Sequence, residues 1–326
     1  MARFLETSAL DEVLARLARS YHLHWPGELR GKTGFVPWQA GQKAALDEAT
    51  DAAAKELFLP RTELLMTFDE SGQEGESRPL AVFGLRPCDA RAVELLDRVF
   101  VEQPPVDGPY QERRRGNLLI GIGCPQPRET CFCSTVGGGP FALSGLDVLL
   151  TAVDGGWVAE AASTAGEEYL ESEEWPSATE EQLEQARLLK EQSQARAEMV
   201  DLEGLAKKLE TSFEAEVWEG LHEKCLGCAV CTYYCPTCHC FDVTDTPEAR
   251  LRTWDSCMFP LFTLHTSGHN PRLSGKERMR QRVMHKFCYY PLRLEDSACV
   301  GCGRCIELCP VNLDIRQVLA ELGGCL

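Results

Sequence analysis

The sequence has no long apolar run and no basic surplus. Across its 326 residues, no stretch approaches the roughly 18 uncharged apolar residues that a membrane-spanning helix needs. The net charge of −17 argues against nucleic acid as a partner. Met1–Leu5 run straight into Glu6 and an amphipathic pattern, so we expect no secretory signal. These features predict a cytoplasmic protein that binds neither a membrane nor nucleic acid.

A dinucleotide-binding fingerprint is also missing. No Gly-x-Gly-x-x-Gly follows a predicted strand, although this is the pattern that holds the pyrophosphate of NAD or FAD at a helix N-terminus. The run Gly137–Gly139 is too short and wrongly placed to replace it. We therefore expect no FAD or NAD in this chain.

The charges are unevenly distributed along the chain. Residues 167–224 contain 17 acidic and 6 basic side chains, whereas residues 246–293 contain 9 basic and 3 acidic ones. Solvated helix and loop faces explain both stretches. Alternatively, the basic stretch offsets the charge of anionic clusters or docks an acidic partner.

Cysteine, by contrast, is abundant. There are 17 cysteines, and an odd number argues against a fully paired disulfide framework. In a reducing compartment such thiols are more often metal ligands than crosslinks. Eight of them form a duplicated pattern, Cys-x2-Cys-x2-Cys-x3-Cys-Pro, at residues 225–236 and 299–310. This run is typical of 4Fe-4S clusters in bacterial-type ferredoxins, whereas zinc sites prefer two separated Cys-x2-Cys pairs.

The spacing also predicts which cysteines act together. The first three of each run lie on one tight turn, and the fourth begins a helix that directs it toward the neighbouring cluster. The predicted ligands of one 4Fe-4S cluster are Cys225, Cys228, Cys231 and Cys309; those of the other are Cys299, Cys302, Cys305 and Cys235. Residues 236–298 form a long insertion between the two runs, which crossed ligation tolerates because loop-closure entropy grows slowly with length.

The N-terminal half has the pattern of an α/β domain. Residues 80–85 and 118–122 are short apolar runs that predict buried strands, and a helix is expected after the first, capped by Asp89. We also predict a loop over residues 25–38 and a helix over residues 42–57. The sheet is expected to be partly parallel.

Three regions follow from these patterns. We predict an α/β domain over residues 1–165, an acidic helical connector over residues 166–222, with a capping box at residues 177–180, and a dicluster ferredoxin-like domain over residues 223–326.

Four further cysteines are candidates for a third 4Fe-4S cluster. Cys88 and Cys124 each follow a predicted strand, and the carboxyl ends of adjacent strands share one crevice. Cys131 and Cys133 lie in the loop after Cys124, and four thiolates is the number a cubane needs. The alternative is that these are buried thiols that pack as small apolar side chains.

The insertion contains a distinctive string, Cys235-Pro-Thr-Cys-His-Cys-Phe-Asp, followed by Arg252-Thr-Trp-Asp-Ser-Cys, by Ser267-Gly-His-Asn-Pro-Arg and by the segment 281–287. Together with Gly84-Leu-Arg-Pro-Cys-Asp and Cys131-Phe-Cys upstream, it closely resembles a family of iron–sulfur proteins. Members include the beta subunit of sulfhydrogenase-type nickel–iron hydrogenases, an iron–sulfur subunit of anaerobic sulfite reductase, and a component of the flavin oxidoreductase modules attached to heterodisulfide reductases.

This resemblance implies an electron shuttle in a multisubunit oxidoreductase. Its partners would be a flavin subunit that exchanges hydride with NAD(P)H and a terminal catalytic subunit, of hydrogenase, sulfite reductase or heterodisulfide reductase type. The alternative is a self-contained enzyme that reduces a sulfur compound at Cys238 and Cys240, or at the cysteines of the first domain. The role of Cys257 is open in both cases.

Overall fold

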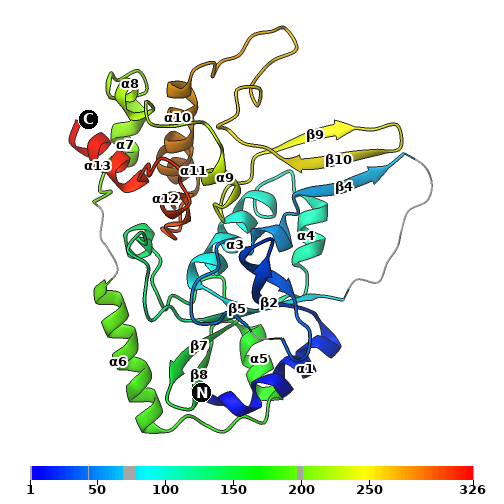
Figure 1. The fold of residues 1–326 in the computed structure, drawn as a ribbon. Coiled ribbons are helices and arrows are strands. Elements are labelled where there is room, and N and C mark those ends of the chain that lie inside the picture. The colour runs from blue at the N-terminus through cyan, green and yellow to red at the C-terminus, as the bar shows by residue number, and fades with distance from the viewer. Residues whose placement is uncertain (1, 43, 69–77, 197–200, 326) are drawn as a thin grey trace. The chain divides into compact units, whose positions relative to one another are not determined.

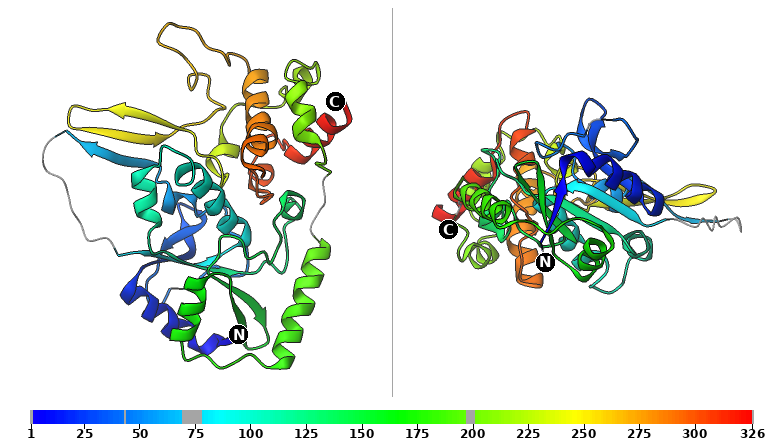
Figure 2. Two further views of the ribbon diagram at one scale, coloured as in Figure 1. Left: turned by 180° about the vertical axis from the view of Figure 1, so that it is seen from behind. Right: turned by 90° about the horizontal axis from the view of Figure 1, so that it is seen from below.

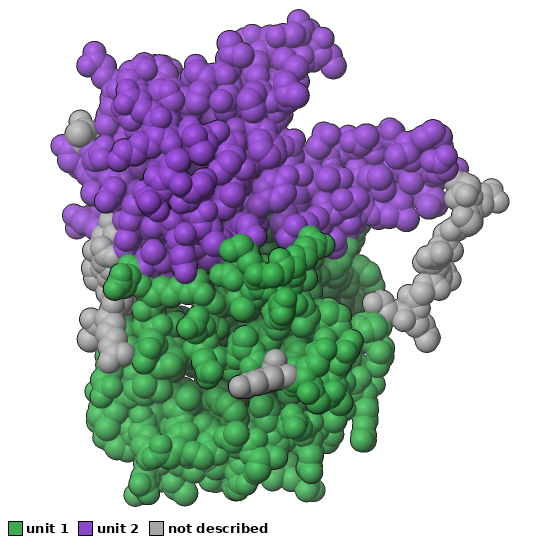
Figure 3. Space-filling view, in the orientation of Figure 1, with its two compact units in different colours: residues 1–58, 74–129, 138–197 green, residues 59–73, 130–137, 198–326 purple. Residues whose placement is uncertain are grey.

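A computed structural model describes residues 2–42, 44–68, 78–196 and 201–325 (Figure 1). The chain divides into two compact units, coloured separately in Figure 3. Unit 1 comprises residues 1–58, 74–129 and 138–197, and unit 2 comprises residues 59–73, 130–137 and 198–326. The units cut across the three predicted domains, since residues 59–73 and 130–137 lie in unit 2. The assignment of a separate functional domain to each of the three ranges stays a prediction.

Unit 1 is built on a seven-stranded mixed sheet with the order β1-β8-β7-β6-β5-β2-β3. Its strands are β1 (Arg3–Glu6), β2 (His22–Leu29), β3 (Lys32–Pro37), β5 (Leu80–Leu85), β6 (Leu118–Ile122), β7 (Val148–Val153) and β8 (Gly156–Ala161). The four central strands β2, β5, β6 and β7 run parallel, and the outer pairs are antiparallel. The predicted strands and the partly parallel sheet are thus confirmed.

Helices cover both faces of this sheet (Figures 1 and 2). They are α1 (Leu10–Ser20, after the 3-10 turn η1, Thr7–Ala9), α2 (Lys55–Phe58), α3 (Pro87–Phe100), α4 (Gly108–Arg114), α5 (Thr164–Ser172) and α6 (Glu180–Arg196). Side chains of α1 and α5 pack on the alternate strand residues that include Phe83 and Ile120, and so form the main core. Figures 1 and 2 show α3 and α4 on the opposite face.

Two expectations for the N-terminal segment were wrong. Residues 25–38 form most of the hairpin β2–β3 rather than a loop, and its turn uses left-handed backbone at Arg30 and Gly31. The helix predicted over residues 42–57 is absent except at its end: residues 44–54 form neither helix nor strand, and residues 55–57 belong to the short helix α2. The Asp51 carboxylate accepts hydrogen bonds from the backbone and hydroxyl of Thr33, and Ala52 pairs with the Thr33 carbonyl. These tertiary bonds outweigh the helix propensity of the alanines.

Two predicted caps also differ. Helix α3 begins at Pro87, with Arg86 as the N-cap, because proline is favoured in the first helical turn and Asp89 therefore falls inside that turn. At α6 the capping box uses Thr179 and Gln182, two residues later than predicted, since each side chain bonds the backbone N–H of the other.

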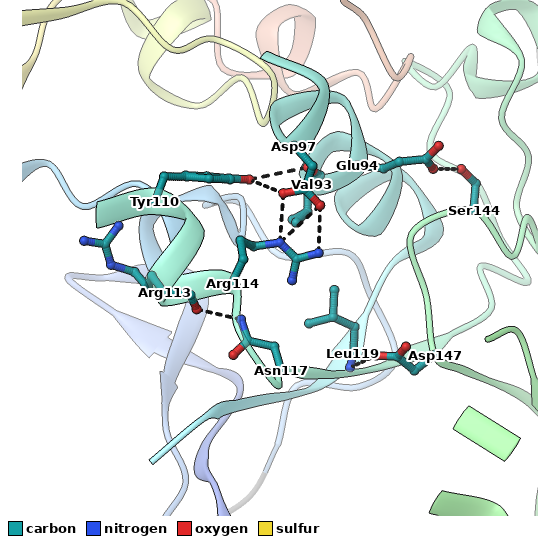
Figure 4. Close-up of polar contacts among 10 residues, drawn as sticks. All are labelled: Val93, Glu94, Asp97, Tyr110, Arg113, Arg114, Asn117, Leu119, Ser144 and Asp147. Carbon is teal, nitrogen blue, oxygen red and sulfur yellow. Dashed lines mark hydrogen bonds and ion pairs between the residues drawn. The ribbon is translucent and has the colours of Figure 1, made fainter. Parts of the chain in front are cut away.

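A polar cluster fixes α4 against α3 (Figure 4). The Asp97 carboxylate accepts a hydrogen bond of 2.7 Å from the Tyr110 hydroxyl and two from Arg114, of 2.9 Å and 2.8 Å. Nearby, Asp147 accepts the backbone N–H of Leu119 at 2.7 Å. These contacts hold the helix that follows β5 and the segment that leads into β6.

Unit 2 combines a small sheet with a helical cluster. The sheet has the order β4-β10-β9, from β4 (Thr62–Thr67), β9 (Phe241–Asp245) and β10 (Ala249–Trp254). The helices are η2 (Cys133–Val136, 3-10), α7 (Leu205–Thr211), α8 (Val217–Leu221), α9 (Val230–Tyr233), α10 (Gly275–Met284), η3 (His285–Tyr289, π-helical), α11 (Tyr290–Leu294), α12 (Arg304–Glu307) and α13 (Ile315–Cys325). Apolar side chains of α7, α8, α10 and α13 share one core.

Most described residues of the acidic stretch 166–222 lie in the helices α5, α6, α7 and α8, but these helices are divided between the two units. Helices α5 and α6 belong to unit 1, whereas α7 and α8 contribute Leu209 and Trp218 to the core of unit 2. Its role as a connector stays a prediction.

Candidate iron–sulfur centre

The two cysteine runs adopt nearly the same backbone conformation. In the first, Gly227 has φ +68° and its N–H lies 3.4 Å from the Cys225 sulfur. In the second, Gly301 has φ +60° and its N–H lies 3.4 Å from the Cys299 sulfur. A left-handed residue then precedes a short helix in each run, α9 or α12. Glycine permits this conformation without a side-chain penalty, and the N–H groups stabilise charge on the sulfurs.

The second run is covered by a loop, whereas the first is not. The Phe132 N–H donates to the Gly301 carbonyl at 2.8 Å, and a β-carbon added at Gly301 would lie 2.5 Å from the carbonyl carbon of Phe132. The equivalent β-carbon at Gly227 would meet nothing closer than 3.7 Å. Beside it, Leu226 is 69% exposed and Cys228 is also exposed.

The first run opens into a cavity with about 530 Å³ of atom-free space, part of it continuous with solvent. Its lining includes all four predicted ligands of one cluster: Cys225, Cys228, Cys231 and Cys309. The remaining wall is largely apolar, with Met258 and Met279 among its residues. In addition, the Leu313 N–H points at the Cys309 sulfur at 3.3 Å. We call this the first cavity.

The second run opens into a cavity with about 360 Å³ of atom-free space. Its lining includes all four predicted ligands of the other cluster: Cys235, Cys299, Cys302 and Cys305. Phe132 closes part of this cavity and is 1% exposed. We call it the second cavity. The fourth cysteine of each run thus lies in the cavity of the other run, which is the arrangement that crossed ligation requires.

The donor set fits a cubane better than a single ion. Each cavity is lined by the four predicted thiol ligands of one cluster around a largely apolar space, and the first is lined by Cys305 as well. Among the described residues no three Cys, His, Asp or Glu side chains gather closely enough to hold one metal ion. Burial raises the pKa of the Cys299 thiol to about 11, although the nearby Lys286 ammonium acts to lower it.

Two buried cations place positive charge beside the sulfurs, whereas the sequence had indicated only a basic stretch. The Arg282 Nε lies 3.2 Å from the Cys231 sulfur, and the Lys286 Nζ lies 3.3 Å from the Cys235 sulfur. Burial acts to lower the pKa of Arg282, but the sulfurs of Cys231 and Cys305 outweigh burial and raise it. The pKa of Lys286 is raised in the same way, chiefly by Cys235. Both side chains therefore remain charged.

Two cysteines of the insertion, Cys238 and Cys257, each bond another cysteine. The Cys238 thiol donates to the Cys235 sulfur, a bond that lowers the pKa of Cys235 and raises that of Cys238. The Cys257 thiol likewise bonds Cys240, which together with burial raises the pKa of Cys257. Cys238 is thus placed to hydrogen-bond a predicted ligand.

The four candidate cysteines of a third cluster are divided between the units. Cys88 and Cys124 lie in unit 1, just beyond the carboxyl ends of the adjacent parallel strands β5 and β6. Between these ends the buried Arg86 side chain donates to the Gly123 carbonyl at 2.6 Å. Cys131 and Cys133 lie in unit 2, where the Cys131 thiol faces the Cys302 carbonyl at 3.7 Å. The third cluster stays a prediction.

Similarity to known proteins agrees with this geometry. Residues 224–313 contain both cysteine runs and match the family model of a 4Fe-4S dicluster domain. The chain is 38% identical over 250 residues to sulfhydrogenase 2 subunit beta of Pyrococcus furiosus, a match that covers 74% of this chain and 73% of the relative. The chain belongs to the sulfhydrogenase beta-subunit family.

This assignment confirms the resemblance carried by the insertion string, and the dicluster match confirms 4Fe-4S binding in the C-terminal part of this sulfhydrogenase beta-like subunit. It is an iron–sulfur subunit of a multisubunit complex. The assignment of each cysteine to one cluster stays a prediction. In the part of the chain that the structure describes, no helix is long and apolar enough to cross a membrane.

Proposed function

We propose that this subunit relays single electrons between a flavin subunit that exchanges hydride with NAD(P)H and a terminal catalytic subunit. The terminal subunit is of hydrogenase, sulfite reductase or heterodisulfide reductase type, and the complex is cytoplasmic. The observation that carries the proposal is the pair of cavities, each lined by the four predicted ligands of one cluster, which share Cys305 and Arg282 in their walls. The Pyrococcus relative, named as a sulfhydrogenase subunit, supports it.

A 4Fe-4S cluster held in each cavity takes up and releases one electron at a time. The chain's own residues fix where this happens. Crossed ligation by Cys235 and Cys309 brings the two centres close enough for electron tunnelling. The largely apolar wall of the first cavity and the cover of Phe132 over the second limit water at the sulfurs, while backbone N–H groups and buried cations stabilise negative charge there.

Electrons exchange with a partner at the first cavity. Cys228 and Leu226 are exposed there, whereas Phe132 covers the second cavity. An exposed ligand shortens the path to a partner's redox centre, and an exposed apolar side chain suits a docking surface. The cluster in the covered second cavity then exchanges electrons with the cluster in the first cavity rather than directly with this partner.

The test is turnover by the isolated chain. Purified alone and reduced, it should pass electrons to artificial dyes yet show no turnover with sulfite, polysulfide or a disulfide. Adding the flavin and terminal subunits should restore turnover with NAD(P)H. Substrate turnover by the isolated chain would contradict the relay and favour a self-contained reductase. Flavin or nicotinamide that copurifies with the chain would contradict the proposed division of labour.

We further propose a third 4Fe-4S cluster held by Cys88, Cys124, Cys131 and Cys133. The position of Cys88 and Cys124 at the ends of adjacent parallel strands supports it. With three clusters the chain holds about twelve iron atoms, and Cys88→Ser should reduce this to about eight. An unchanged iron content in that variant would contradict the third cluster.

A further inference from the structure

Arg282 and Lys286 stand four residues apart on one continuous helical stretch, at α10 and the π-turn η3. Residues with this spacing lie on the same side of a helix. Arg282 is 5% exposed and Lys286 is 4% exposed. Single-turn π-helical segments often occur at functional sites, where they displace side chains from regular α-helical positions.

The two cations contact different parts of the dicluster site. Arg282 is in the wall of both cavities, with its Nε near the Cys231 sulfur and its Nη2 donating to the Cys231 carbonyl at 3.1 Å. Lys286 is in the wall of the second cavity alone. Its Nζ contacts the Cys235 sulfur, the Thr237 hydroxyl at 3.0 Å and the Ala298 carbonyl at 2.8 Å.

Neither cation has a carboxylate partner within ion-pair distance among the described residues. The Arg282 Nη1 is buried and has no hydrogen-bond partner there either. A buried guanidinium is costly unless it is paired. Among the described residues, the largest negative influences on the two cations come from cysteine sulfurs, and these become anionic when they bind metal.

We propose that Arg282 is the shared counter-charge of both cluster sites and that Lys286 is the counter-charge of the second site alone. Positive charge beside a cluster favours its reduced form, because net charge and hydrogen bonds to the sulfurs set the reduction potential. Arg282 therefore raises both potentials together and leaves the difference between them unchanged. Lys286 makes the second site the better acceptor. This inference rests on the ligation proposed above.

Arg280 provides a matched control on the same helix. It is also a largely buried arginine, 8% exposed, but it pairs with Glu214 at 3.2 Å and donates to the Phe213 carbonyl at 2.7 Å. It is in the wall of neither cavity. Arg280→Gln removes the same charge from the same helix without touching the sites.

The experiment is a redox titration of the full-length, cluster-loaded chain, followed by electron paramagnetic resonance. The signal of the second site is assigned with Cys302→Ser and that of the first site with Cys228→Ser, each of which should lack one signal. In Arg282→Gln, the ratio of reduced to oxidised cluster at a fixed potential should fall about tenfold at both sites, which is about 59 mV per one-electron centre. In Lys286→Gln it should fall at the second site alone. Arg280→Gln should leave both ratios unchanged.

Several results would overturn the proposal. These are unchanged ratios in Arg282→Gln, a shift at one site only, or an equal shift in Arg280→Gln. If Arg282→Gln does not retain its iron, the proposal is tested with Lys286→Gln and Arg282→Lys instead. Lys286→Gln must shift the second site and spare the first, and Arg282→Lys, which keeps the charge, must keep both ratios near wild type. Failure of the ligation itself is distinct, because the wild-type chain would then lack two cluster signals.

Discussion

The two cysteine runs have the same spacing and nearly the same backbone, yet their surroundings differ. The first lies open, with Leu226 and Cys228 exposed. The second is closed by the segment around Phe132, whose N–H is bonded to Gly301. A duplicated motif therefore specifies how two clusters are bound, while segments far away in sequence decide which of them reaches solvent.

The residue after the second cysteine of each run shows how far this difference goes. Position 229 is alanine in the first run and position 303 is glycine in the second, although both have left-handed backbone. A β-carbon at Gly303 would lie 2.3 Å from the Thr130 hydroxyl oxygen and 2.7 Å from the Thr130 carbonyl. The covering loop therefore requires glycine at position 303, whereas the turn alone accommodates the alanine of the first run.

Removing the cover should have the largest effect. Phe132→Ala empties a fully buried site and should lower the free energy of unfolding by about 3–5 kcal/mol. Leu226→Ala, at the exposed first run, should change it by less than about 0.5 kcal/mol. Urea unfolding of the cluster-loaded chain measures both. Equal losses would mean that the two runs are equally covered.

The two turn glycines give a second pair. Gly227→Ala should cost only the left-handed conformation, about 1–2 kcal/mol. Gly301→Ala adds a clash with the Phe132 backbone and should cost about 1–3 kcal/mol more, with loss of iron from the second site. Denaturant midpoints together with iron analysis give the comparison. A smaller loss in Gly301→Ala than in Gly227→Ala would contradict it.

The two sites should also differ in the rate at which their clusters are destroyed in the wild-type chain. Because Cys228 is exposed, an iron chelator or oxygen should destroy the cluster of the first run before that of the second. Time-resolved electron paramagnetic resonance during exposure follows each signal. In Phe132→Ala the rates at which the two cluster signals are lost should become more similar. Loss of the second signal first in the wild-type chain would reverse the assignment of the open site.

The smallest structural change is expected for Leu226→Gln. It should leave iron content and potentials unchanged, yet slow electron exchange with the flavin or terminal subunit, because it removes exposed apolar surface beside the open site. Stopped-flow reduction within the reconstituted complex measures the rate. An unchanged rate would place partner docking elsewhere.

The sequence predicted those parts in which spacing or apolar pattern determines structure. The strands at residues 80–85 and 118–122 are confirmed, and the eight cysteines of the two runs come together in two cavities. It failed where tertiary contacts decide. In the alanine-rich segment, residues 44–54 are irregular because the backbone N–H groups of Ala45 and Ala52 bond carbonyls of β2 and β3. Residues 25–38, although rich in glycine and proline, form a hairpin.

The sequence also did not predict the long-range contacts to the cysteine sulfurs. The basic stretch at residues 246–293 indicated charge compensation, but only the fold singles out Arg282 and Lys286 from the other basic residues. Nothing in the pattern Cys-Phe-Cys predicts that Phe132 covers the second cavity. One sign of this cover was present in the sequence, because position 303 is glycine whereas the equivalent position 229 of the first run is alanine.

The central claim is that the C-terminal runs hold two 4Fe-4S clusters. It is tested most directly by iron and acid-labile sulfide in the full-length Cys88→Ser chain, in which a third cluster cannot add to the count. The account predicts about eight of each per chain, and about four after Cys235→Ser is added. About four of each in Cys88→Ser alone, or iron without sulfide, would contradict it.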